Sequence, residues 1–209
     1  MKGKGLIYGI IIFIIAAGFI SGPILLRNGK ATDPDFHLDN SRSYLLRDYD
    51  YQRSHEQLDK AIFAMRELEK RLDDEGKKII EKSISDLNII AREIEERALV
   101  KADMNIAYAE ALNALTFAEI KISEHLLEID ASQDAIIELK YGMLHLRNAL
   151  KYAEDDNLKE FEMHIYEELD SLIANKSLSH DEMKERLDQM LVELGHFVDE
   201  SDSLLRTER

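Results

Sequence analysis

Apolar residues recur every three or four positions from about residue 41 onward, which is the period of a helix with one buried face. The first stripe predicts a helix over 41–73, either continuous or broken near Asp50. The next two stripes predict either one helix over 77–129 or two helices separated near 98–103. The three stripes are Leu58, Ala61, Met65, Leu68 and Leu72; Ile80, Ile84, Leu87, Ala91, Ile94 and Ala98; and Met104, Tyr108, Ala111, Leu115, Ala118, Ile122, His125 and Ile129.

Three further helices are expected before the C-terminus. The expected N-terminal caps are Ser132 for the fourth helix, Asn157 with Glu160 for the fifth, and Ser179 with Glu182 for the sixth. The stripe of the fourth helix keeps the heptad spacing typical of coiled coils and consists of Ile136, Leu139, Met143, Leu146, Leu150 and Ala153. Short connections make successive helices antiparallel, so the pattern predicts an all-α, up-and-down bundle of about five to six helices.

The scarcity of turn-forming residues supports this fold class. The chain has nine Gly and two Pro, and the 175 residues after Pro34 contain no further proline and three glycines. β-Sandwiches and barrels need turn residues at short, regular spacing. The composition therefore favours helices throughout.

The opening run GLIYGIIIFIIAAGFISGPILL, residues 5–26, carries no charge and is long enough to cross a bilayer as a helix, about 33 Å. Lys2 and Lys4 precede the run, and Arg27 and Lys30 follow it. With the α-amino group, the positive charge is heavier on the N-terminal side. This favours a single-pass anchor with its N-terminus in the cytoplasm and the bulk of the chain extracytoplasmic.

A cleaved signal peptide is the alternative interpretation of the same run. Small residues at Ala16, Ala17 and Gly18 offer a cleavage site, and the mature chain would then begin at Phe19 as a secreted or periplasmic protein. The apolar residues that follow this site favour the retained anchor. The predicted organisation is thus an anchor or signal over 1–27, a linker over 28–40 and an acidic helical-bundle domain over 41–209.

Charge and cysteine content exclude several classes of function. The chain has 42 Asp and Glu against 27 Lys and Arg, and no cysteine. Such an acidic surface repels nucleic-acid phosphates, so no nucleic-acid partner is expected. Without cysteine there are no disulfides, thiolate metal sites or thiolate-bound clusters.

No enzyme motif is present, since the sequence lacks a phosphate-binding Gly-rich loop, G-x-S-x-G and H-E-x-x-H. The leading hypothesis is therefore a non-enzymatic accessory or structural subunit of a membrane complex that acts through protein contacts. Tyr44, Tyr49 and Tyr51 form a candidate contact patch, because Tyr is a typical interface anchor. The other interpretation of these tyrosines is packing within the first turns of a long helix.

Metal binding is the alternative function. His145 and His164 flank the turn at 155–157 almost symmetrically, with Met143 and Met163 close by, so an antiparallel hairpin would bring them to similar heights. His and Met are suitable ligands for copper or zinc. Heptad position favours surface histidines instead, because His145 lies two residues beyond the core position of Met143, towards solvent.

The same hairpin carries a resemblance to a known family. The segment HLRNALKYAEDDNLKEFEMHIYEELDSL, within about residues 142–172, resembles the small metal-binding proteins, which are periplasmic helical hairpins with a polar turn between two His-bearing helices. The resemblance implies a copper- or zinc-binding role for His145 and His164. The alternative hypothesis is therefore an extracytoplasmic copper- or zinc-binding protein associated with a membrane metalloenzyme such as a copper monooxygenase.

Overall fold

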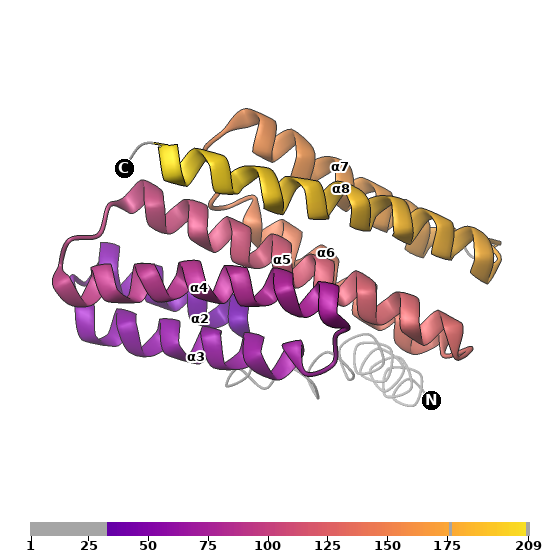
Figure 1. Ribbon diagram of the computed structural model, residues 1–209, viewed down its shortest axis with the longest axis horizontal. Helices are drawn as coiled ribbons and strands as arrows, with labels where there is room; N and C mark the ends of the chain where they lie inside the picture. The colour runs from indigo at the N-terminus through magenta and orange to yellow at the C-terminus, as the bar shows by residue number, and fades with distance from the viewer. Residues whose placement is uncertain (1–32, 176, 208–209) are drawn as a thin grey trace, which may run out of the picture. The chain divides into compact units, whose positions relative to one another are not determined.

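The computed structural model describes residues 33–175 and 177–207, with side chains as far as residue 196. This part of the chain is all helical and contains no strand, which confirms the predicted fold class (Figure 1). Its helices are α2 (Pro34–Leu46), α3 (Tyr51–Glu69), α4 (Asp74–Glu96), α5 (Lys101–Glu128), α6 (Ser132–Ala149), α7 (Asp156–Ala174) and α8 (His180–Thr207). The seven helices exceed the expected five to six, because a break near Asp50 divides the first predicted helix into two.

Helix α2 corrects the predicted linker. Residues 34–40 are helical, and Leu38 is fully buried. Pro34 is the first helical residue, a position that suits proline because its fixed φ matches the helix and its missing N–H has no partner there. The linker predicted over 28–40 therefore cannot extend beyond Asp33.

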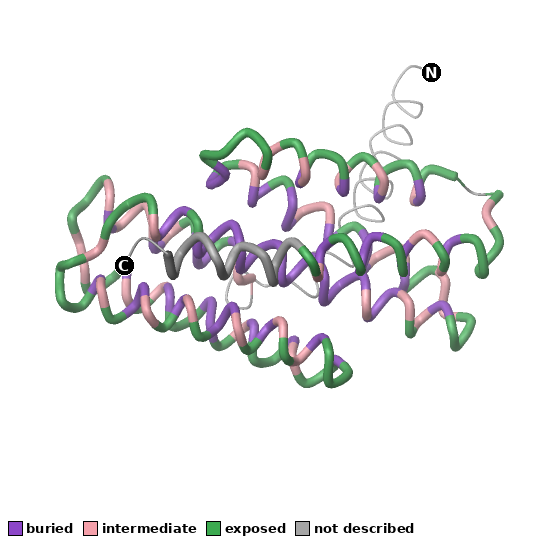
Figure 2. The backbone as a smooth tube through the Cα atoms, turned by 45° about the horizontal axis from the view of Figure 1, so that its top comes forward, coloured by how far each residue is buried: buried purple, intermediate pink, exposed green. Residues whose placement is uncertain are grey.

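Helix α5 is shared by two hydrophobic cores. One core lies among α2, α3, α4 and α5 and includes Ala149 at the end of α6, and the other lies among α5, α6, α7 and α8. All residues over 107–120 are buried, whereas the other helices bury mainly their inner sides (Figure 2). The dense alanines of this helix allow its neighbours to approach closely on both sides.

Contacts between neighbouring helices give their directions. Ser41 of α2 meets Ser54 of α3, and Ser123 of α5 bonds the carbonyl of Ala135 in α6, so these successive helices are antiparallel. Helix α2 runs in the same direction as α6, because Asp35 contacts His145 and Asp39 contacts Lys151. The first helix of the bundle thus lies beside the fifth.

The ends of the helices confirm some of the predicted breaks and caps. Arg97 adopts a left-handed φ of 57° and ends α4, which places a break between α4 and α5. Ser179 and Glu182 form the predicted capping box at the start of α8. The other predicted caps are wrong, since the N-caps of α6 and α7 are Ala131 and Asp155 instead of Ser132 and Asn157.

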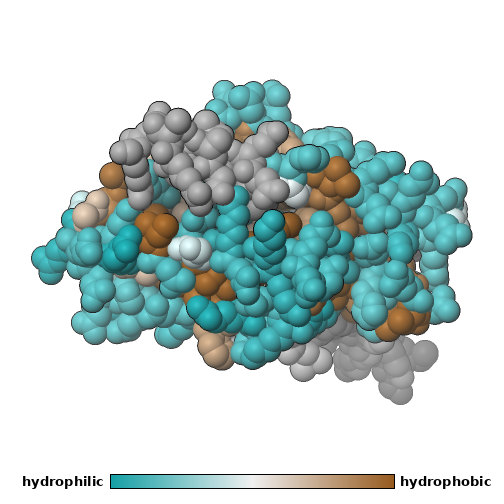
Figure 3. Space-filling view, viewed as in Figure 1, coloured by the Kyte–Doolittle hydropathy of each residue, from teal (hydrophilic) through white to brown (hydrophobic). Residues whose placement is uncertain are grey.

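None of the helices in residues 33–207 is long and apolar enough to span a bilayer. The predicted anchor, residues 5–26, lies outside the described residues. The face of the domain seen in Figure 3 is largely hydrophilic, with separate hydrophobic patches, as expected for a chain in which 33% of residues are charged.

Candidate functional site

Helix α6 has a second buried face that the apolar stripe does not include. This face consists of Ala135, Glu138, Gly142, His145 and Ala149. The spacing is again that of a heptad, but the residues are small or polar. They lie against α5, where the hydroxyl of Thr116 donates to the Gly142 carbonyl at 3.2 Å. This close approach brings His145 into the interior of the domain.

His145 stands between two buried carboxylates from different helices. Its Nδ1 lies 2.7 Å from Asp35 Oδ1 on α2, and its Nε2 lies 3.8 Å from Glu119 Oε1 on α5. The Asn148 amide donates to the other oxygen of Asp35. All four residues are buried, and His145 is only 4% exposed. This cluster joins α2, α5 and α6.

The contacts in this cluster stabilise the charged forms of His145 and Asp35. Burial alone would lower the pKa of His145, but the attraction and hydrogen bond of Asp35, together with Glu119, outweigh burial and raise the pKa to about 10. Burial alone would raise the pKa of Asp35, but His145 and Asn148 outweigh it and hold that pKa below its usual range. At neutral pH the imidazole is therefore a cation paired with the Asp35 carboxylate.

The expectation that His145 faces solvent is thus wrong. The apolar residues Leu139 and Leu146 do pack in the core shared with α7 and α8, as the stripe predicted. The heptad argument failed because it allowed α6 only one buried face. The sequence pattern was also wrong for His125, which it placed on an apolar stripe. The side chain is exposed and lies beside Glu128 in the last turn of α5.

The four residues predicted to bind metal have separate surroundings. His164 is 56% exposed and its Nε2 lies 3.4 Å from Glu193 on α8, whereas His145 faces α2 and α5. Met163 is exposed, and Met143 packs against the core of α6, α7 and α8. Within the described residues, no group of three or more His, Asp or Glu is arranged to hold a metal ion. Metal binding by these four residues stays a prediction.

Another buried carboxyl, outside this cluster, lies where α7 meets α5. Glu162 is fully buried and accepts a hydrogen bond of 3.0 Å from the Asn113 amide. Among the described residues, nothing donates to its other oxygen. Burial raises the pKa of Glu162 to about 7, although the bond from Asn113 acts in the opposite direction. Sequence analysis missed this residue, because a single Glu in an acidic helix gives no signal of burial.

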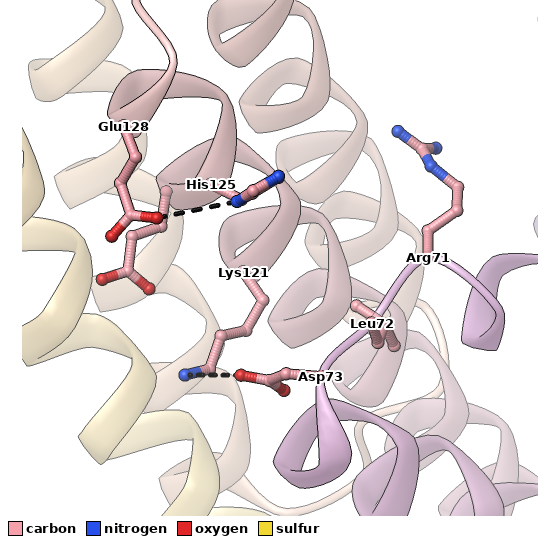
Figure 4. Close-up of a pocket in the computed structure, with 7 residues that line it drawn as sticks. Arg71, Leu72, Asp73, Lys121, His125 and Glu128 are labelled. Carbon is pink, nitrogen blue, oxygen red and sulfur yellow. Dashed lines mark ion pairs between the residues drawn. The ribbon is translucent and has the colours of Figure 1, made fainter.

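A charged pocket of about 480 Å³ lies between the α3–α4 turn and the last turns of α5 (Figure 4). Its cations are already paired: Lys121 lies 2.8 Å from Glu75, and Arg71 lies 2.8 Å from Glu138. Burial alone would lower the pKa of Lys121, but Glu75 and the other nearby carboxylates outweigh burial and raise it. These ion pairs thus connect the α3–α4 turn with α6, and α4 with α5.

The opposite end of these helices exposes apolar and aromatic groups. Arg97, in the α4–α5 turn, lies 5.2 Å from the ring centroid of Tyr51 in the first turn of α3, so the α2–α3 and α4–α5 turns are neighbours. A pocket of about 320 Å³ lies there. In the same two turns, Tyr49 is 73% exposed and Val100 is 55% exposed. We call Tyr49, Tyr51, Arg97 and Val100 the tyrosine end.

The three tyrosines of the predicted contact patch differ in their surroundings. Tyr49 is exposed, as a contact patch requires. Tyr44 is half-buried and its ring is covered by Arg53 at 5.7 Å, as in the packed-helix interpretation. Val100 and Arg97 were not predicted as members of this patch, because the α4–α5 break was placed too broadly to assign them to a turn.

Comparison with family models, with curated proteins and with solved structures finds no match to this chain.

Proposed function

We propose that this chain is a membrane-anchored, extracytoplasmic helical-bundle protein that acts through protein contacts, as an accessory or structural subunit of a membrane complex. The observation that carries the proposal is the tyrosine end. Large side chains are exposed there at two neighbouring turns, and tyrosine and arginine are the residues most often found at the energetic centre of interfaces. The polar networks inside the domain hold helices together and leave this end for a partner.

Charge indicates the kind of partner. The chain has a formal net charge of −15, and Glu56 and Glu95 line the pocket at the tyrosine end. A partner surface that carries Lys or Arg around an apolar centre would complement both features. The proposed partner is therefore a basic protein surface.

The apolar run over residues 5–26 supports the proposed anchor and its orientation. Retention of this run is checked by sequencing the N-terminus of the mature protein. A retained anchor leaves residues 5–26 in place, whereas a mature chain that begins at Phe19 would show that the run is a cleaved signal.

Site-specific photocrosslinking in native membranes tests the contact. A photoreactive amino acid at position 100 should crosslink the chain to one distinct heavier protein. The same group at Glu167, an exposed position on α7, is the matched control and should give no such product. Recovery of the chain only as a free monomer from position 100 would contradict the proposal.

A further inference from the structure

The turn between α2 and α3 is strained. It spans residues 47–50 and contains neither glycine nor proline. Tyr49 nevertheless adopts a φ of 53°, in the left-handed region that a bulky L-residue occupies only at a cost. Because the Tyr49 side chain is largely exposed, its packing contributes little to offset that cost.

Asp50 provides the bonds that keep the turn closed. Its backbone N–H donates to the Tyr44 carbonyl at 2.9 Å, and its carboxylate accepts from the Arg53 N–H at 3.0 Å. The second bond is exposed to solvent. If residues 47–50 became helical, α2 and α3 would form one continuous helix over 34–69, about 54 Å long.

Helix α2 is bound to the rest of the domain through side chains that lie outside this turn. The bonds to α3 are Ser41 with Ser54 and His37 with Gln57; those to α5 are Ser41 with Tyr108 and Arg42 with Asn105; those to α6 and its C-terminal turn are Asp35 with His145 and Asn148, and Asp39 with Lys151 and Tyr152. Leu38 and Leu45 add the buried apolar contacts. A second copy of α2 would find the same partners in the same groove.

We propose that two copies of this chain exchange α2, so that each copy extends residues 34–69 as one helix and inserts its α2 into the groove of the other. The exchanged dimer keeps every contact of α2 and removes the left-handed residue from both turns. Short connections under strain favour such an exchange. The inference goes beyond the proposed function, because it concerns a second copy of the chain and does not depend on the tyrosine end binding another protein.

An engineered disulfide distinguishes the two arrangements. The Oγ atoms of Ser41 and Ser54 are 3.0 Å apart, and the natural chain has no cysteine, so the double variant Ser41→Cys/Ser54→Cys has a single pair of thiols. In the closed chain the disulfide forms within one copy. In the exchanged dimer these residues are about 20 Å apart along one helix, so each thiol must pair with a thiol of the other copy.

The experiment uses the full-length double variant in mild detergent. The protein is incubated with its thiols reduced, over a hundredfold range of protein concentration, and is then oxidised. We expect a disulfide-linked dimer on a non-reducing gel, in a fraction that rises with concentration. Adding Tyr49→Gly, which relieves the strain of the closed turn, should lower this fraction several-fold. Adding Asp50→Ala, which removes the cap of α3, should raise it.

The proposal is overturned if the double-cysteine variant, alone or with either turn substitution, forms only monomers with an internal disulfide at every concentration. It is also overturned if neither Tyr49→Gly nor Asp50→Ala changes the dimer fraction. If the cysteine pair prevents folding, light scattering on the cysteine-free chains decides the matter. Asp50→Ala must then contain more dimer than wild type, and Tyr49→Gly less. Val100→Glu lies in the α4–α5 turn, outside residues 47–50, and should leave the dimer fraction unchanged.

Discussion

His145 and His164 stand on adjacent helices and have opposite surroundings. His145 is buried between Asp35 and Glu119, whereas the side chain of His164 is 56% exposed beside Glu193. A buried ion pair contributes little net stability compared with an apolar packing, but removal of one partner leaves an uncompensated charge in the interior. The two residues should therefore respond very differently to substitution.

Replacement of His145 by Leu should lower the free energy of unfolding by about 3–5 kcal/mol, because Asp35 and Glu119 then lose their buried cation. His164→Ala is the matched control and should change it by less than about 0.5 kcal/mol. Urea unfolding at pH 7, followed by circular dichroism, measures both. Equal effects of the two substitutions would contradict the assigned surroundings.

Glu162 should make the domain less stable as pH rises. Its pKa is raised from 4.5 to about 7 by burial, so the folded state binds the proton more tightly than the unfolded state does. The stabilising effect of the proton is present below pH 4.5 and is lost as pH rises through about 7. At pH 8 the ionised carboxylate then costs about 3 kcal/mol.

Glu162→Gln removes this ionisation and should raise the free energy of unfolding at pH 8 by more than at pH 4.5, by up to about 3 kcal/mol. Glu160→Gln, exposed on the same helix, should have the same small effect at both pH values. Urea titrations at the two pH values provide the comparison. If Glu162→Gln raises the free energy of unfolding equally at both pH values, the Glu162 carboxyl of the wild-type protein is already neutral or hydrated at pH 8.

At the scale of helices, α6 shows what an apolar pattern can and cannot predict. Leu139 and Leu146 mark the face that packs towards α7 and α8, and the heptad spacing located it from sequence. The face towards α5 contains Glu138, Gly142 and His145, which resemble solvent-facing residues in composition. Their burial depends on the close approach of another helix, which periodicity within one helix does not report.

The start of α2 was missed for a different reason. The interpretation of residues 28–40 as a linker rested on their Gly, Pro, Asp and Asn content. Asp33 directly before Pro34 is also a helix-start signal, because proline is favoured at the first helical position. The cluster of Asp35 and His145 could be predicted only after this helix and the second face of α6 were both recognised.

Gly142 gives a test of the packing between α5 and α6. A Cβ at this position would lie 3.6 Å from Thr116 Cγ2, an ordinary van der Waals distance. Gly142→Ala should therefore stabilise the domain by about 0.5–1 kcal/mol through the higher helix propensity of alanine. Gly76→Ala is the contrasting variant, because its Cβ would lie only 3.1 Å from Leu72 Cβ and should give no such gain. Thermal unfolding of both variants measures the difference, and a loss of stability in Gly142→Ala would mean that the helices lie closer than described.

At the scale of the whole domain, two cores meet along α5, and charged networks join the helices around them. The Asp35–His145–Glu119 cluster and the ion pairs of the charged pocket are internal ties. The tyrosine end is different, because Tyr49 and Val100 are exposed in the two turns that the contact between Arg97 and the Tyr51 ring brings together. A domain held together in this way is suited to present its tyrosine end to a partner.

The native mass of the full-length chain, extracted from its own membrane in mild detergent, tests this account most directly. We predict a species heavier than two copies of the 24.1 kDa chain, and we predict that Val100→Glu shifts the chain to a smaller species without changing its helical content. A wild-type chain no heavier than a monomer or dimer, or a larger species that Val100→Glu leaves intact, would contradict the proposed membrane complex.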